Sequence, residues 1–168
     1  MNVMEAIKTR RSIRKYDARP IEGEKLDAVM EAARLAPSAG NQQQWKFVLV
    51  RDAQKVQAFT EAANGQKFVG EAPAVIVVCA TGSRVMACGQ PTSTVDLSIA
   101  MTHILLAAHE LGLGTCWLGN FSAEKVKALL GIPEDVAVVA VTPIGYPAET
   151  PEARPRKAAE EVISYDKY

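Results

Sequence analysis

The chain has 168 residues, of which 48% are hydrophobic and 23% are charged, and its 19 lysines and arginines are balanced by 19 aspartates and glutamates. This length and composition are typical of one domain that buries a sizeable core. The neutral balance argues against a general nucleic-acid or membrane-surface binder, because the affinity of both depends on excess positive charge.

The cysteines and histidines predict neither a disulfide framework nor a metal site. Cys79, Cys88 and Cys116 are odd in number and have no CxxC spacing, which is typical of a chain in a reducing cytoplasm. His103 and His109 are six residues apart, on different faces of a helix, so we interpret both as structural. No segment approaches the roughly 18 apolar residues of a membrane span.

The chain opens with a helix that Asn2 caps and that ends near Arg10, and a cationic segment follows at residues 10–16 (RRSIRKY). If this segment is extended, its side chains alternate in direction. One side then carries Arg10, Ser12 and Arg14, and the other carries Arg11, Ile13 and Lys15. Two guanidiniums beside a hydroxyl suit a phosphate or carboxylate. The alternative is that Arg10 and Arg11 only stabilise the negative pole of the helix, by about 0.3–1 kcal/mol.

A second helix is predicted at residues 23–36, and an amide-rich loop follows at residues 37–45 (PSAGNQQQW). Asparagine and glutamine side chains each present a donor and an acceptor. The loop therefore suits the edge of a heterocycle on which N–H and C=O groups alternate. The alternative is an ordinary polar loop.

A strand at 45–50 and a helix at 52–63 come next, and residues 73–80 form a continuous apolar run that is typical of a strand buried on both faces. After a loop at 81–91, the longest helix is predicted at 92–111. One apolar face of this helix carries Leu97, Met101, Ile104, Ala108 and Leu111, and a nearly opposite face carries Val95, Ile99 and Leu106. Either the helix is central in its own domain, or its second face packs on another chain. We favour another chain, because few elements remain to cover that face.

The last third of the chain contains a short strand within 112–119, a helix from Ser122 to Leu130 and a strand at 136–144. A candidate edge strand follows at 161–163. Arg154 and Arg156 lie on one side of an extended Arg-Pro-Arg segment, which makes them a second candidate anion clamp, although a solvated tail explains them as well. The chain has no GxGxxG, no P-loop and no Ser/His/Asp or Cys/His constellation. If it is an enzyme, a bound cofactor carries the chemistry.

Six motifs in order resemble the FMN-dependent nitroreductase family: RRSIRKY (10–16), APSAGNQQQWKF (36–47), GLGTCWLG (112–119), LGIPE (130–134), GYP (145–147) and RPRK (154–157). The resemblance implies one α+β domain over residues 1–168, a three-layer α/β/α fold whose mostly antiparallel central sheet is flanked by helices. It also implies a homodimer with a long helix at the interface and two FMN sites lined by both chains. Residues 150–168 are expected to extend onto the partner subunit.

The resemblance also implies roles for individual residues. Arg10, Arg11, Ser12 and Arg14 would form an FMN cradle, with Arg14 toward the N1/O2 edge of the flavin, and Arg154 and Arg156 would contact the phosphate. The backbone at Trp117, Leu118 and Gly119 would reach the O4/N5 side. The loop along the ring and ribityl chain, expected from the partner subunit, would comprise Pro37, Ser38, Ala39, Asn41 and Gln43. No side chain is expected to be catalytic.

The implied function is an FMN-dependent oxidoreductase in which NADH or NADPH reduces the flavin, which then reduces a nitroaromatic, quinone or similar small acceptor. The alternatives are a flavin or ferric reductase, other FMN chemistry on the same fold, and a non-catalytic FMN-binding module. The chain departs from the family pattern at Gln44, where proline is usual. In addition, residues 81–91 leave little room for the helical excursion that larger members place over the flavin.

Overall fold

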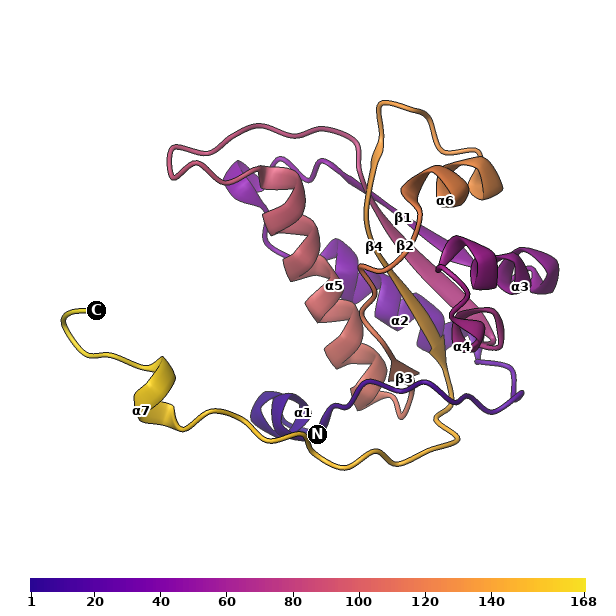
Figure 1. Cartoon of the computed structure of the whole chain (residues 1–168), viewed down its shortest axis with the longest axis horizontal. Helices are drawn as coiled ribbons and strands as arrows, with labels where there is room; N and C mark the ends of the chain where they lie inside the picture. Colours follow the sequence, from indigo (N-terminus) through magenta and orange to yellow (C-terminus); the bar gives the residue numbers. More distant parts are fainter.

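A four-stranded antiparallel sheet forms the middle layer of the computed structural model, which describes residues 1–168 (Figure 1). Its strand order is β1-β2-β4-β3, with β1 at Trp45–Val50, β2 at Ala74–Ala80, β4 at Ala137–Gly145 and β3 at Gly114–Thr115. Every residue of the central strand β2 is buried. The continuous apolar run therefore lies where both faces of the sheet are covered, as predicted.

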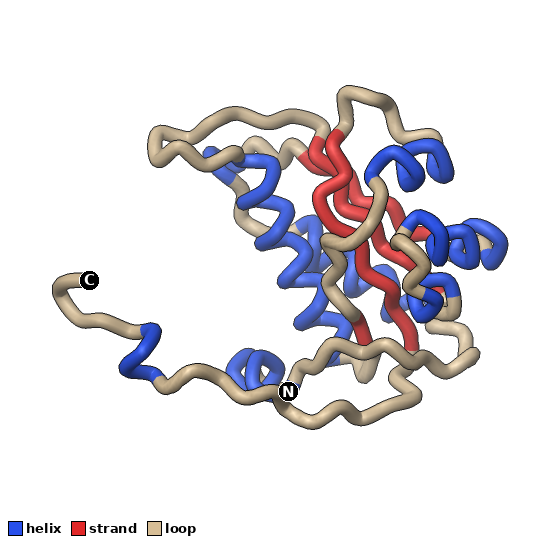
Figure 2. Tube along the Cα trace, in the orientation of Figure 1, coloured by secondary structure: helices blue, strands red, loops and turns tan.

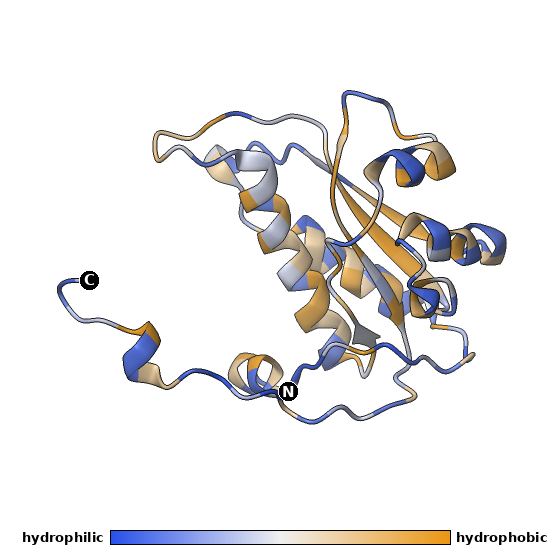
Figure 3. Ribbon diagram, viewed as in Figure 1, coloured by the Kyte–Doolittle hydropathy of each residue, from blue (hydrophilic) through white to orange (hydrophobic).

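Two layers of helices cover the two faces of the sheet (Figures 1 and 2). Alternate β2 residues such as Ile76 and Val78 pack with α2 (Gly23–Arg34) and α5 (Thr92–Glu110). The intervening residues, Val75 and Val77, pack on the other face with α3 (Ala53–Ala62), α4 (Lys67–Gly70) and α6 (Ala123–Leu130). Because side chains alternate along a strand, one apolar run supplies two separate cores. The apolar residues accordingly concentrate on the sheet and on the inner sides of the helices (Figure 3).

The helix boundaries follow the capping residues read from the sequence. The side chains of Asn2, Asp52 and Ser122 each accept a backbone N–H in the first turn of α1 (Val3–Thr9), α3 and α6. Gly131 ends α6 in the left-handed conformation with φ of 66°, which glycine adopts without steric cost. Local side-chain chemistry therefore determines where these helices begin and end.

The long helix α5 has 19 residues, and on the apolar face toward the sheet Leu97, Met101, Ile104 and Ala108 are buried, whereas Leu111, just after the helix, is half-buried. The second face, with Val95, Ile99 and Leu106, is only half-buried. In Figure 1 the side of α5 that faces away from the sheet meets open space. None of the helices combines the length and the apolar composition needed to cross a bilayer.

The candidate edge strand at 161–163 is wrong. Residues Ala159–Val162 form a short helix, α7, in which the Ile163 N–H donates to Ala159 O over 2.8 Å. The segment extends away from the sheet, and residues 152–168 are all exposed (Figure 2). Without a neighbouring strand to satisfy its backbone, the segment makes local hydrogen bonds instead.

The cationic segment is held against the short strand β3. The Ile13 N–H donates to Thr115 O over 2.9 Å, and the Ile13 side chain is buried. Gly114 makes this approach possible, because a Cβ at that position would lie 2.7 Å from Cγ1 and 2.8 Å from Cβ of Ile13. The closest contact is therefore with a branched, buried side chain that has little freedom to move.

We predict that Gly114→Ala lowers the free energy of unfolding by about 1–3 kcal/mol, because the added methyl overpacks the Ile13 contact. Urea denaturation measures the change. The control is Gly23→Ala at the start of α2, where no atom lies within 4 Å of the added Cβ and the free energy should stay the same or rise. Equal stability of the two variants would contradict the close-packing argument.

Candidate cofactor site

The cationic segment starts where α1 ends and presents its charges unequally. Arg10 and Arg11 are half-buried, whereas Arg14 and Lys15 are exposed and Ile13 between them points into the core. Buried Ile13 and exposed Arg14 differ as the alternation requires, but Lys15 is exposed although the alternation puts it on the side of Ile13. The segment forms no regular strand, although Ser12 pairs with Thr115 as an isolated parallel bridge.

Arg11 makes the helix-end interaction that the sequence offered as an alternative. Its Nη1 donates to the carbonyl oxygens of Lys8, at 2.9 Å, and Arg10, at 3.0 Å. These carbonyls lie at the C-terminal end of α1, where helices leave backbone acceptors unsatisfied. Part of the donor capacity of Arg11 is therefore used within the chain.

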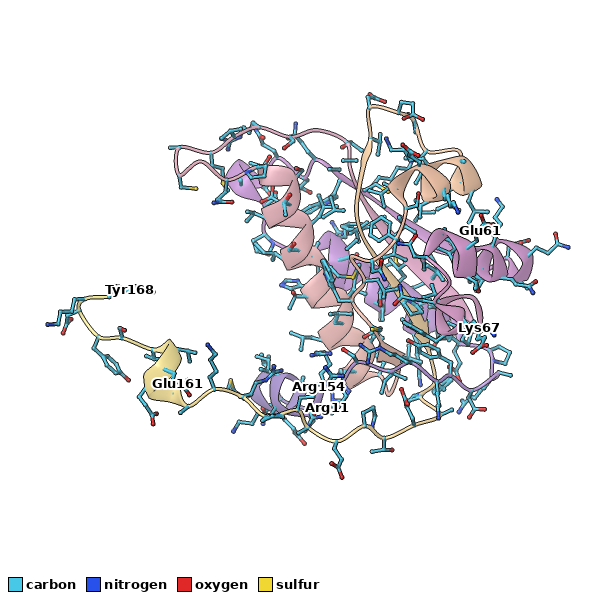
Figure 4. All side chains as sticks on the ribbon, viewed as in Figure 1. Arg11, Glu61, Lys67, Arg154, Glu161 and Tyr168 are labelled. Carbon is cyan, nitrogen blue, oxygen red and sulfur yellow. The ribbon has the colours of Figure 1, made fainter.

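Arg10, Arg11 and Arg156 form a cluster of guanidiniums that make no ion pair. The pKa of Arg10 is lowered, first by burial and then by the charges of Arg156 and Arg11. The C-terminal segment thus brings Arg156 close to the end of α1. In the view of Figure 4, Arg11 and Arg154 are both labelled where this segment passes α1. None of the ion pairs in the structure involves Arg10, Arg11, Arg14, Arg154 or Arg156. A cluster of like charges of this kind fits a multiply charged anion such as a phosphate monoester.

A second wall of the site comes from residues 116–119, directly after β3. Leu118 is buried, and its N–H and C=O both pair with Val141 of β4, at 2.9 and 3.2 Å. Trp117 and Gly119 on either side are exposed, and neither backbone N–H donates to a protein acceptor. Two free N–H groups flanking an anchored residue fit the acceptor atoms of a heterocycle.

Glu149, Tyr16 and Phe68, which were not among the predicted site residues, support the cationic segment. Glu149 accepts the Arg14 N–H over 2.6 Å, and the Tyr16 hydroxyl donates to Ile13 O over 2.7 Å. The Arg14 guanidinium lies 6.0 Å from the ring centroid of Phe68 in α4. The contacts of Arg14 with Glu149 and Phe68 join segments far apart in the sequence, so no local pattern marks them.

Cys116 lies at the back of the site as a buried thiol. Burial is the main cause of its raised pKa, and the nearby Arg14, Ser12 and Arg10 act in the opposite direction. The sulfur therefore remains protonated at neutral pH and is no nucleophile. The Cys116 N–H donates to Thr142 Oγ1 over 3.2 Å, which fixes the turn into residues 117–119.

The amide-rich loop is built from unusual backbone conformations and one buried carboxylate. Gly40, Asn41 and Gln43 all have positive φ, at 63°, 53° and 52°. Asp96 in the first turns of α5 is buried, and its Oδ1 accepts the Ala39 N–H over 3.1 Å. The Ser38 hydroxyl accepts the Gln43 N–H over 3.1 Å. The loop is thus held on the N-terminal end of α5.

The two predicted halves of the site lie at opposite ends of α5. Thr9, at the end of α1, hydrogen-bonds His109 over 2.7 Å, whereas the amide-rich loop is bound to Asp96. At 1.5 Å per residue, about 20 Å of helix separates these two anchors. Within one chain, the residues Arg10, Arg11, Ser12, Arg14, Arg154 and Arg156 belong to the end where α1 meets α5. Trp117, Leu118 and Gly119 follow β3 toward the middle of β4, where Leu118 pairs with Val141. The loop residues Pro37, Ser38, Ala39, Asn41 and Gln43 lie at the other end of α5.

Known proteins resemble the chain over nearly its whole length. The family model described as "Nitroreductase family" matches residues 7–69 and 55–146. A protein of Methanothermobacter thermautotrophicus named "Putative NADH dehydrogenase/NAD(P)H nitroreductase" is 42% identical over 158 residues, which is 92% of this chain and 82% of that protein. The NADPH-flavin oxidoreductase of Vibrio harveyi is 32% identical over 99% of this chain and 75% of its own.

Solved structures show the same fold. A nitroreductase family protein from Clostridium difficile 630 superimposes with a TM-score of 0.90 at 29% identity and covers both chains completely. The NADPH:FMN oxidoreductase from Vibrio harveyi complexed with NAD+ reaches a TM-score of 0.89 at 31% identity, over 98% of this chain and 77% of its own. By the family model, the relatives and the shared α/β/α architecture, the chain belongs to the nitroreductase family.

Proposed function

We propose that the chain is an FMN-dependent NAD(P)H oxidoreductase that reduces nitroaromatics, quinones or similar small acceptors. The main support for this function is the cluster of arginines without ion-pair partners, together with the free N–H groups of Trp117 and Gly119. That combination fits a phosphorylated heterocycle such as FMN. The relatives named NADPH-flavin oxidoreductase and oxygen-insensitive NADPH nitroreductase support the same reaction class.

Bound FMN would supply hydride and electron transfer, and the chain would bind, orient and polarise it. In this proposal Arg10, Ser12, Arg154 and Arg156 hold the phosphate, with Arg11 adjacent. Trp117 and Gly119 face the O4/N5 side, and Leu118 between them anchors that stretch on β4. Arg14 lies toward the N1/O2 edge, where a fixed positive charge stabilises the negative charge of the reduced ring. No side-chain acid, base or nucleophile is required.

We further propose a homodimer in which each FMN site uses both chains. Two α5 helices packed antiparallel across a twofold axis would place the amide-rich loop of each protomer beside the cationic segment of the other. The two segments, which are about 20 Å apart within one chain, would then meet between chains. The half-buried face of α5 supports this arrangement. Further support comes from the exposed apolar residues Val3, Met4 and Ile7 on α1 and from the extended segment 150–168.

A cytoplasmic location is also part of the proposal. All three cysteines are free, two of them buried, which suits a reducing compartment.

Reduction of free flavin is the second candidate function. A protein of Bacillus subtilis named FMN reductase [NAD(P)H] is 29% identical over 99% of this chain. In addition, residues 81–91 form only a short connection between β2 and α5, which leaves the proposed ring face open to bulky acceptors. An anaerobic panel of nitroaromatics, quinones and free flavins distinguishes the candidates by which acceptor reoxidises the enzyme.

We predict that the purified protein is yellow or takes up one FMN per chain, and that NADH or NADPH bleaches the flavin absorbance near neutral pH without oxygen. Spectrophotometric titration measures both. A protein that shows no flavin spectrum after FMN is added would overturn the proposed function. A yellow protein that neither nucleotide bleaches would instead be a non-catalytic binding module.

We predict that Arg14→Ala weakens FMN binding and slows flavin reduction roughly tenfold, which corresponds to about 1.4 kcal/mol. Stopped-flow absorbance measures the reduction rate. The control is Arg19→Ala, because Arg19 pairs with Glu22, lies over the ring of Tyr146 and is outside the cationic segment. If both variants reduce the flavin at the same rate, Arg14 has no role at the ring.

We predict that Ile99→Glu with Leu106→Glu yields a monomer that has also lost FMN, since both sites need the second chain. Light scattering after size exclusion measures the mass, and absorbance measures the bound flavin. The control is Ala128→Glu, an exposed position of α6 on the other face of the sheet. A monomeric double variant that keeps its FMN would contradict the shared site.

A further inference from the structure

The connection between β2 and α5 is a closed hairpin fixed on the first turn of α5. We call residues 81–91 the rim hairpin. The Arg84 N–H donates to Thr92 Oγ1 over 3.0 Å, and the Thr92 N–H donates back to Arg84 O over 2.9 Å. Further along, the Met86 N–H donates to Gln90 O over 2.9 Å. Since Thr92 is buried, the backbone of Arg84 has a fixed position.

The rim hairpin packs on the amide-rich loop. The Thr81 N–H donates to Gln44 O over 3.1 Å, and a Cβ at Gly82 would lie 2.7 Å from Gln44 Nε2. Arg84 Nε donates to Gln42 Oε1 over 3.2 Å. Its Nη2 lies 3.6 Å from the position that a Cβ on Gly40 would take, so the guanidinium lies over the loop.

Arg84 is the only charged residue in these two segments. Residues 35–45 and 81–95 contain no other lysine, arginine, aspartate or glutamate. Arg84 makes no ion pair, and its one side-chain hydrogen bond, from Nε to a neutral amide, leaves both Nη groups free. The nearest carboxylate along the chain, Asp96, is buried and bound to the Ala39 N–H. The guanidinium is thus a positioned cation with unused donors beside the positive pole of α5.

We propose that Arg84 binds a phosphate of the nicotinamide co-substrate and so determines the affinity of that substrate. This rests on the proposed function, in which the amide-rich loop lines the flavin of the partner subunit. The nicotinamide must stack on the flavin ring. The rest of the dinucleotide is larger than the ring and therefore extends past its edge, over the protein segments that line it. The fork of a guanidinium matches the oxygens of a phosphate, and Arg84 supplies the only such fork in residues 35–45 and 81–95.

Two groups of the co-substrate have this chemistry, the pyrophosphate and the 2′-phosphate. The pyrophosphate is present in both NADH and NADPH, whereas the 2′-phosphate is present only in NADPH. Comparing the affinities for NADH and NADPH therefore shows which of the two groups Arg84 binds. Arg84 is exposed, so its replacement leaves the core intact.

The experiment compares Arg84→Gln and Arg84→Lys with the control Arg51→Gln, an exposed arginine just after β1, at the opposite end of that strand from the amide-rich loop. Anaerobic stopped flow measures the apparent Kd of NADH and NADPH and the limiting rate of flavin reduction. Titration calorimetry measures the Kd of NADP+ on the oxidised holoenzyme. Both are repeated at low salt and at 0.5 M NaCl.

We expect Arg84→Gln to raise the Kd of NADPH and of NADP+ roughly five- to tenfold while the limiting rate changes less than twofold. Arg84→Lys should recover part of the affinity. The difference from the wild type should shrink at high salt, because screening weakens an exposed charge pair. A loss of affinity for NADPH alone identifies the 2′-phosphate, and an equal loss for NADH identifies the pyrophosphate; both outcomes support the proposal.

If Arg84→Gln binds all three nucleotides as Arg51→Gln does, the role of Arg84 is overturned while the proposed function stands. A wild-type holoenzyme that neither NADH nor NADPH reduces would overturn the proposed function and the role of Arg84 together. The two failures are therefore distinguishable in the same set of measurements.

Discussion

The length of α5 is the constraint on which the site depends. Its buried face packs on the sheet, its first turns hold the amide-rich loop through Asp96, and its last turn holds α1 through His109. An α-helix is stiff over this distance, so the two loops cannot approach each other within one chain. In the proposed dimer, the second apolar face of α5 pairs with an antiparallel copy of the same helix. The amide-rich loop of one chain then lies beside the cationic segment of the other.

Charge is the second organising feature. The chain as a whole is neutral, yet Arg10, Arg11 and Arg156 lie together without a carboxylate among them. Elsewhere on the surface, cations such as Arg19, Arg34 and Lys125 pair with glutamates. Like charges in close proximity repel each other, so a cluster left unneutralised lowers stability until an anion binds. Ligand binding to the folded chain then returns that free energy as added stability.

Much of the fold could be read from the sequence because its signals are local. Asn2, Asp52, Ser122 and Gly131 mark helix ends through contacts within a single turn, and the alternation of β2 side chains follows from strand geometry alone. The error at residues 161–163 has the opposite cause. An edge strand needs a neighbouring strand, and the course of the tail away from the sheet is decided by the rest of the molecule.

The sequence by itself determined the types of residue in the proposed site: arginines with a hydroxyl, an amide-rich loop and a late basic pair. The sequence left open which groups each arginine contacts, because the alternation of side chains along an extended segment predicts where a side chain points but not what it meets. Only the tertiary structure decided that Arg11 donates to the end of α1, that Arg156 lies near Arg10, and that Glu149 and Thr142 hold the backbone of the site. The tertiary structure likewise placed Arg84 over the amide-rich loop. These contacts join residues far apart along the chain, and they form only after the core has packed.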